Sequence, residues 1–155
     1  MLYMAKEIER KFLVISDSFI KEAVSSREIS QGYLCTNPDA TVRVRISGPE
    51  AWLTVKSRNH GAARGEWEYH VPVDDARSML AECCAGRSLE KTRYIVPAAE
   101  EGLKWEIDVF HGRHEGLVVA EIELPSEGTP FTRPPFVGEE VTGNPRYYNS
   151  VLIGE

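Results

Sequence analysis

The sequence predicts a mainly β protein of the α+β class, with a few helices outside its sheet. Eight short segments alternate apolar with polar or charged residues and are bounded by turn-forming residues, as antiparallel strands are. Only two segments carry the spacing or the capping residues of a helix. The 155 residues suit a single domain over residues 1–155, built on an antiparallel sheet or on a closed barrel.

The expected strands cover residues 6–14, 28–35, 41–47, 51–57, 66–73, 89–97, 103–110 and 116–124. A short helix is expected at about residues 19–25, after the capping residues at 16–18. A second helix is expected from Asp74 to about Ala85, because Gly86 is a natural stop. Residues 58–65 are expected to form a loop. The proline-rich tail from Pro125 is expected to wrap the body without regular structure until residues 141–152.

Composition excludes several classes of protein. The formal net charge of −6 is the wrong sign for a protein that binds duplex nucleic acid. No stretch approaches the ~18 apolar residues of a membrane span, and the first residues lack an apolar signal region. Three cysteines, two of them adjacent, make no disulfide framework. We therefore expect a cytoplasmic protein without nucleic-acid or membrane partners; a homodimer is left open.

Charge follows the strand period. Residues i and i+2 of a strand lie on one face, ~6.6 Å apart. Seven of the expected strands carry charges on such a face and core-forming residues on the other. The charged faces contain Glu7, Glu9, Lys11, Arg43, Arg45, Lys56, Arg64, Glu66, Glu68, Lys91, Arg93, Glu106, Asp108, Glu121 and Glu123.

Two arrangements account for this pattern. The charged faces could meet bulk solvent on a one-sided sheet, or they could line the lumen of a closed barrel whose apolar core lies outside, under the helices. We favour the lumen. A solvated face would mix in Ser, Thr, Asn and Gln, whereas here charges recur at alternate positions and each pair has one sign.

A charged lumen needs a ligand, because burying unpaired charge is costly. The eight acidic and seven basic residues of the set nearly balance, which suits a polyanion bound together with divalent cations. Carboxylates are suitable ligands for Mg²⁺ or Mn²⁺. Arginine binds phosphate oxygens in a bidentate fashion, and lysine acts as a compact positive charge.

The first strand is also similar to a known signature. Glu7-x-Glu9-x-Lys11 resembles that of the CYTH, or triphosphate tunnel metalloenzyme, superfamily. The motifs that follow in the same order are Gln31-Gly32-Tyr33-Leu34, Arg43-x-Arg45, Thr54-x-Lys56, Arg64-x-Glu66-x-Glu68, Glu90-Lys91-Thr92-Arg93-Tyr94, Glu106-x-Asp108-x-Phe110, Glu121-x-Glu123, Gly138-x-Glu140-x-Thr142 and Arg146-Tyr147-Tyr148-Asn149.

The resemblance covers nearly the whole chain and implies an eight-stranded antiparallel barrel, a tunnel that cleaves or cyclises triphosphates with Mg²⁺ or Mn²⁺. Within the superfamily the chain is most similar to the short bacterial group, whose substrate is inorganic tripolyphosphate. Hydrolysis would then release pyrophosphate and phosphate. The implied metal ligands are Glu7, Glu9, Glu106, Asp108, Glu121 and Glu123. The implied substrate-binding residues are Lys11, Arg43, Arg45, Lys56, Lys91 and Arg93. Catalysis is assigned to Lys91, Tyr33, Glu66 and Glu68, with both glutamates also open as metal ligands.

Some assignments stay open. Tyr33 either orients the triphosphate or only packs in the wall. Trp52, Trp67 and Trp105 are expected to pack in the wall, and the His111-x-x-His114 turn to be solvated. The alternative functions are a nucleoside or thiamine triphosphatase, a CYTH-type adenylate cyclase, and a non-enzymatic polyphosphate or nucleotide sensor. The complete set of acidic residues argues against the sensor, because binding alone needs only the basic residues.

Overall fold

The computed structural model describes residues 6–153. Within this range, the chain forms nine strands in one antiparallel sheet and two α-helices. The strands are β1 (Lys6–Val14), β2 (Ser25–Cys35), β3 (Ala40–Ser47), β4 (Glu50–Ser57), β5 (Ala63–Val71), β6 (Ser88–Pro97), β7 (Lys104–Phe110), β8 (Val118–Glu123) and β9 (Val137–Glu140). The helices are α1 (Val73–Cys83) and α2 (Asn149–Leu152), and three 3₁₀ turns are η1 (Ile20–Glu22), η2 (Gly112–His114) and η3 (Pro145–Tyr147).

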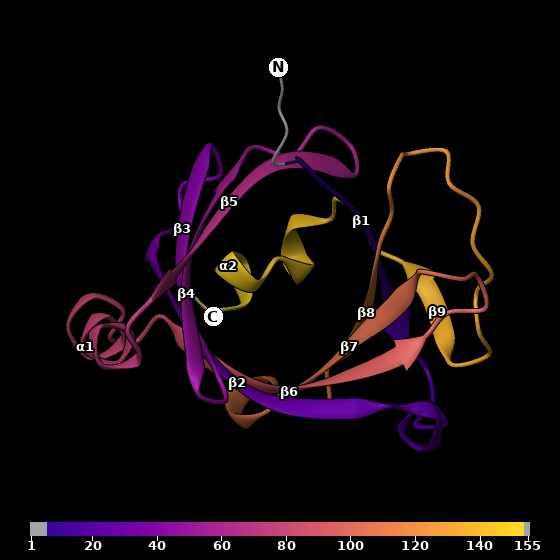
Figure 1. Ribbon diagram of the computed structural model, residues 1–155, viewed down its shortest axis with the longest axis horizontal. Coiled ribbons are helices and arrows are strands. Elements are labelled where there is room, and N and C mark those ends of the chain that lie inside the picture. Colours follow the sequence, from indigo (N-terminus) through magenta and orange to yellow (C-terminus); the bar gives the residue numbers. More distant parts are fainter. Residues whose placement is uncertain (1–5, 154–155) are drawn as a thin grey trace.

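The sheet closes into a barrel (Figure 1). Its strand order is β5-β4-β3-β2-β6-β7-β8-β1, and β1 then pairs with β5. Within residues 6–153, three residue pairs join β1 to β5, from Lys6↔Gly65 to Ile8↔Ala63. Further along the same edge of β1, β9 replaces β5. The predicted eight-stranded antiparallel barrel is confirmed, with β9 as an additional strand on its outside.

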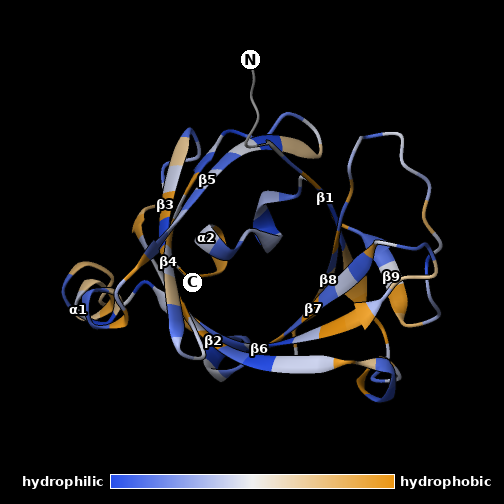
Figure 2. Ribbon diagram, in the orientation of Figure 1, coloured by the Kyte–Doolittle hydropathy of each residue, from blue (hydrophilic) through white to orange (hydrophobic). Residues whose placement is uncertain are grey.

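The apolar core lies outside the barrel, as the alternation predicted. The largest cluster of buried side chains is centred on Phe12 and Trp105 and includes Phe136 from the tail. A second outer cluster lies where α1 covers β2, β3 and β4, around Val44 and Ala76. Figure 2 shows hydrophilic and hydrophobic residues alternating along the strands. One face of each strand is thereby free to carry charge into the lumen.

The C-terminal segment, residues 145–153 with η3 and α2, closes one end of the barrel. In Figure 1, α2 lies within the outline of the strands. Leu152 and Ile153 are buried against Tyr33, Phe110 and Val119, which belong to β2, β7 and β8. The lumen therefore has an apolar floor at this end.

Some expected elements differ from the structure. The helix expected at 19–25 is the shorter 3₁₀ turn η1, because the chain is already extended at Ala23 and Val24 donates to Ile95 of β6. Part of the loop expected at 58–65 belongs to β5. The tail contains β9, which pairs with the free half of the β1 edge. Neither α-helix of the described range is long and apolar enough to cross a membrane.

Candidate active site

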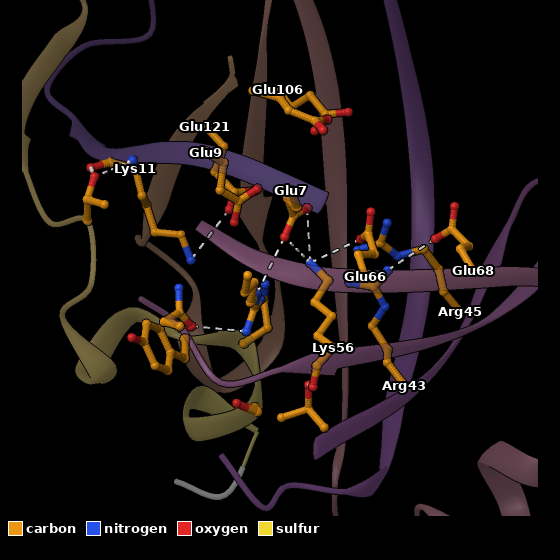
Figure 3. Close-up of a pocket in the computed structure, with 18 of the residues that line it drawn as sticks. Glu7, Glu9, Lys11, Arg43, Arg45, Lys56, Glu66, Glu68, Glu106 and Glu121 are labelled. Atoms are coloured by element: carbon orange, nitrogen blue, oxygen red, sulfur yellow. Dashed lines mark hydrogen bonds and ion pairs between the residues drawn. The ribbon is translucent and has the colours of Figure 1, made fainter. Parts of the chain in front are cut away.

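The charged faces of the strands enclose a cavity of about 190 Å³ inside the barrel (Figure 3). The structure brings most of the predicted site residues together on its wall. Those that line it are Glu7, Glu9, Lys11, Tyr33, Arg43, Arg45, Lys56, Arg64, Glu66, Glu68, Arg93, Glu106, Glu121 and Glu123. Alternation along the strands positions them, because those that share a strand lie two residues apart, as Glu7, Glu9 and Lys11 do on β1.

Four carboxylates from two neighbouring strands form an acidic group: Glu7 and Glu9 of β1, and Glu121 and Glu123 of β8. Glu9 lies opposite Glu123 in the strand pair. Burial raises the pKa of Glu9 well above its ordinary value, and the charges of Glu121 and Glu7 add to the effect. Burial likewise raises the pKa of Glu123, together with the charge of Glu7. The acidic group thus holds more negative charge than its protein neighbours neutralise.

Two of the four carboxylates are compensated by basic neighbours. Burial alone would raise the pKa of Glu7, but Lys56 Nζ lies 2.9 Å from its Oε1, and the net pKa is lowered. Lys11 Nζ lies 3.5 Å from Oε2 of Glu121. The charges of Lys11 and Arg93 outweigh the burial of Glu121 and hold its pKa well below the usual range.

A basic group faces the cavity from other strands: Arg43 and Arg45 of β3, Lys56 of β4 and Arg93 of β6. Arg43 donates to Thr54 Oγ1 at 3.2 Å, and Thr54 donates to Glu68. Arg45 makes no ion pair within residues 6–153. Burial lowers its pKa to about 9, and the positive charges of Arg43 and Arg93 contribute. A bound anion would relieve this repulsion.

Arg45 has one neutral partner that the sequence did not single out. The Nε atom of Arg45 donates to Gln31 Oε1 at 2.9 Å, and Gln31 is completely buried. Gln31 lies on the lumen face of β2, two residues before Tyr33. This i, i+2 spacing from Tyr33 could have indicated from the sequence that Gln31 faces the lumen. The structure therefore adds Gln31 as the residue that orients a phosphate-binding candidate.

Two predicted site residues lie on the lumen face of their strands but do not line the cavity. Lys91 is completely buried, and its Nζ lies 2.6 Å from Oδ2 of Asp108. Asp108 also accepts two hydrogen bonds from Arg93, at 2.7 and 2.9 Å. Neither Lys91 nor Asp108 lines the cavity. Both oxygens of Asp108 are thus occupied by protein cations, which favours a counter-ion role over metal binding.

The C-terminal segment supplies wall residues that had no predicted role. Tyr148, Asn149 and Ser150 line the cavity. Lys11 Nζ donates to the carbonyl oxygen of Tyr147 at 3.0 Å. The motif at 146–149 was part of the resemblance, but nothing in its spacing indicated that it folds back into the lumen.

The tryptophans and histidines differ partly from expectation. Trp105 is completely buried in the outer core, as expected. Trp52, by contrast, packs against His70, with ring centroids 4.9 Å apart. It also lines a second cavity of about 330 Å³, which shares Arg45, Arg93, Glu68 and Glu106 with the first. The reason is register, because Trp52 pairs with Arg45 and lies on its face of the sheet.

The turn after β7 is largely exposed, as expected, and its histidines are also hydrogen-bonded. His111 Nε2 lies 2.6 Å from Thr92 Oγ1. His114 Nε2 lies 2.6 Å from the carbonyl oxygen of Leu152. The turn thus contacts both the barrel wall and the C-terminal segment.

Comparison with known proteins places this tunnel in a family. The family model of the CYTH domain matches residues 5–149, which is nearly the whole chain. The chain belongs to the CYTH domain family. Its closed eight-stranded barrel and charged lumen agree with that membership.

Two relatives align with nearly the whole chain. The chain is 45% identical over 150 residues to a protein of Acetivibrio thermocellus named inorganic triphosphatase, covering 97% of this chain and 94% of the relative. It is 40% identical over 149 residues to an inorganic triphosphatase of Nitrosomonas europaea, covering 94% and 95%. A crystal structure described as an inorganic triphosphatase aligns with a TM-score of 0.69 at 36% identity, covering 96% of this chain and 98% of the other.

CYTH proteins resembling this one are expected to use a divalent cation, and the donor set of the tunnel fits one. The acidic group offers only carboxylate oxygens, the ligands that Mg²⁺ and Mn²⁺ prefer. Burial, together with the charges of neighbouring carboxylates, raises the pKa of Glu9 and Glu123, and a bound cation would favour their ionised forms. Within residues 6–153, no three His, Cys, Asp or Glu side chains already converge as a complete ligand set. Substrate oxygens and water would have to supply the remaining ligands.

Proposed function

We propose that this CYTH-domain protein hydrolyses inorganic tripolyphosphate to pyrophosphate and phosphate inside the barrel, with Mg²⁺ or Mn²⁺. One observation carries the proposal: a cavity with an acidic group and a basic group is closed at one end by the C-terminal segment. The names of the two full-length relatives support the same reaction.

The basic group would hold the phosphate chain. Tripolyphosphate carries roughly −4 to −5 charges near neutral pH, since a terminal phosphate titrates near 6. Arg43, Arg45 and Arg93 offer guanidinium groups for bidentate contacts, and Lys56 and Lys11 offer compact charges. Because the site is mostly buried, these contacts are worth more than they would be in water.

The acidic group would hold the cation, through Glu7, Glu9, Glu121 and Glu123, with Glu106 at the edge of the cavity. When bound, the cation would neutralise phosphate charge and acidify an attacking water. Glu66 and Glu68, on β5, face the cavity beside Lys56 and Arg43 and are proposed to position that water. Tyr33 would orient the triphosphate from the floor, while Lys91 would act through Arg93 and Asp108.

The test is phosphate release from tripolyphosphate, ATP, thiamine triphosphate and pyrophosphate, each with Mg²⁺, with Mn²⁺ and with EDTA. We expect metal-dependent release from tripolyphosphate at the highest kcat/KM, and none from pyrophosphate. Tight binding of tripolyphosphate without phosphate release would contradict the proposal and favour the sensor. Formation of cyclic AMP from ATP would favour the adenylate cyclase. A variant with Arg43→Ala and Arg45→Ala is the inactive control, and Arg77→Ala on the exposed face of α1 is the active one.

The second cavity favours one alternative within the same fold. It is lined by Trp52, Ile29 and Ile95, so an organic group attached to a triphosphate would meet an aromatic ring and two aliphatic side chains there. A nucleoside or thiamine triphosphatase would use this space. In that case Trp52→Ala would raise KM for ATP or thiamine triphosphate and leave KM for tripolyphosphate unchanged.

The environment and assembly belong to the same proposal. A cytoplasmic location fits the three free cysteines and the need for a triphosphate and a divalent cation. A homodimer is the assembly to test, by light scattering of the purified protein. A monomer of 17.4 kDa would remove that part of the proposal without affecting the reaction.

A further inference from the structure

The turn between β7 and β8 contacts the end of the C-terminal segment. Arg113 donates through Nη2 to the carbonyl oxygen of Ile153 at 2.5 Å. His114 lies with Nε2 2.6 Å from the carbonyl oxygen of Leu152. A carbonyl oxygen only accepts, so His114 must carry its proton on Nε2 and donate. Two side chains of one 3₁₀ turn thus bind two consecutive carbonyls at the end of α2.

Without the turn, these two carbonyls would lack hydrogen-bond partners at the end of a very short helix. The last carbonyls of any helix lack partners within it. A helix of four residues such as α2 is not stable by itself, so its position depends on contacts with the barrel. Leu152 and Ile153 supply apolar contacts with the floor, but such contacts are not directional. The two hydrogen bonds from the turn fix the direction and register of the segment.

The opposite surface of the segment forms part of the active-site cavity. Tyr148, Asn149 and Ser150 line it, and the carbonyl of Tyr147 accepts from Lys11. Asn149 Oδ1 is shielded from solvent and has no hydrogen-bond partner within the described chain. An unpaired buried acceptor at a cavity wall is costly unless a ligand or a water donates to it.

We propose that Arg113 and His114 are positioning residues, which hold the C-terminal segment so that Asn149 and the Lys11–Tyr147 contact stay in place for the substrate. Neither side chain lines the cavity, so both act only through the segment. The inference rests on the proposed function for its kinetic consequence, but its structural consequence does not depend on the reaction.

The first measurement needs no substrate. Removing both hydrogen bonds in the variant Arg113→Ala/His114→Ala is expected to weaken docking of the segment by about 10- to 100-fold. Hydrogen exchange of the amides of Val151, Leu152 and Ile153 should quicken by that factor, while exchange in the strands stays the same. His114→Gln keeps an N–H donor near the Nε2 position and should exchange as the wild type does. Unchanged exchange in the double variant, or faster exchange throughout the barrel, would overturn the proposal.

The matched control is Arg87→Ala. Arg87 also donates to a carbonyl near a helix end, that of Cys83 at 2.8 Å, but at α1 outside the barrel. This variant should leave both the exchange of α2 and the kinetics unchanged.

The second measurement is the dissociation constant and KM for tripolyphosphate. The double variant should raise both by about 10-fold or more, with a smaller change in kcat and an unaltered melting temperature of the barrel. Asn149→Ala should raise the dissociation constant and KM by a smaller factor in the double variant than in the wild type, because both changes act on one segment. Additive effects, or an unchanged KM, would overturn the positioning role. If the wild type neither binds nor cleaves tripolyphosphate, the proposed function fails while the exchange result stands separately.

Discussion

The ammonium group of Lys91 and the carboxylate of Asp108 form an ion pair of 2.6 Å in the wall of the barrel, where both side chains are buried. Burial lowers the pKa of Lys91 to about 7, although Asp108 opposes the shift. The charges of Arg93 and Lys91 outweigh burial and hold the pKa of Asp108 well below its usual range. The pair therefore stays ionised on the carboxylate side, with Arg93 as the second cation.

Asp108→Asn is expected to lower the free energy of unfolding by about 3–5 kcal/mol, because it leaves Lys91 and Arg93 without their shared carboxylate. Urea denaturation at pH 7 measures the loss. The matched control is Asp74→Asn, which breaks the exposed pair with Arg77 and should change stability by less than about 0.5 kcal/mol. Equal stability of the two variants would contradict the assignment of Asp108 as a buried counter-ion.

Arg45→Met is expected to weaken tripolyphosphate binding about 10- to 100-fold, since charge-assisted hydrogen bonds to phosphate contribute about 1.5–3 kcal/mol. The apo protein should be no less stable, because burial and the charges of Arg43 and Arg93 disfavour the charged form of Arg45. Gln31→Leu should weaken binding in the same direction by a smaller factor, because it frees the guanidinium that Gln31 orients. Isothermal titration calorimetry measures binding, and thermal melting measures apo stability. Binding as tight as in the wild type for Arg45→Met would rule out this arginine as a phosphate ligand.

Glu9→Gln is expected to separate stability from function. Burial and the charges of Glu121 and Glu7 raise the pKa of Glu9 in the folded state, so folding favours its protonated form. The folded protein is thus penalised increasingly as the pH rises above the ordinary value of 4.5, and the variant should gain stability at pH 7 in EDTA but not at pH 4. The same variant should lose about 100-fold or more of its metal-dependent activity. A loss of stability at pH 7 would contradict the charge excess inferred for the acidic group.

Glu140→Gln tests the attachment of β9. Arg10 donates two hydrogen bonds to Glu140, at 2.6 and 2.8 Å, and these together with Thr142 keep the pKa of Glu140 low. A carboxylate with a lowered folded-state pKa stabilises the fold fully above 4.5, and this contribution is lost as the pH falls through that lowered value. The pair is about one-third exposed, so we expect a cost of about 0.5–1 kcal/mol at pH 7. The difference in free energy of unfolding between the variant and the wild type should become smaller below pH 4. Denaturation curves at several pH values check this, and a constant difference would contradict the ionic origin.

Sequence patterning predicted the barrel and its charged face because strand alternation is strict. A residue such as Arg43 or Glu121 can lie on only one of two faces, and its apolar neighbours determine which. Alternation does not show how deeply a side chain is buried or which side chains form ion pairs across strands. It put Lys91 and Arg93 on the same face, but only the structure shows that Asp108 binds both and that Lys91 does not line the cavity.

The C-terminal segment could not be placed from its sequence. A helix of four residues has no periodic pattern to detect, and α2 is held by long-range contacts with η2 and the floor. Trp52 was expected in the wall. Its spacing from Lys56, four residues later on β4, could have indicated that it lies on the charged face, and its pairing with Arg45 confirms this position.

The pairing of β1 with strands much later in the chain has a consequence for how the protein is synthesised. β1 is made first, yet its partners β5, β8 and β9 begin at Ala63, Val118 and Val137. Because synthesis adds ~5–20 residues per second, β1 stays unpaired for several seconds until these strands have been made. During that time Glu7, Glu9 and Lys11 act as gatekeepers, since charges at alternate positions discourage association of one nascent chain with another. The side chains that later face the phosphate chain thus also keep the waiting strand soluble.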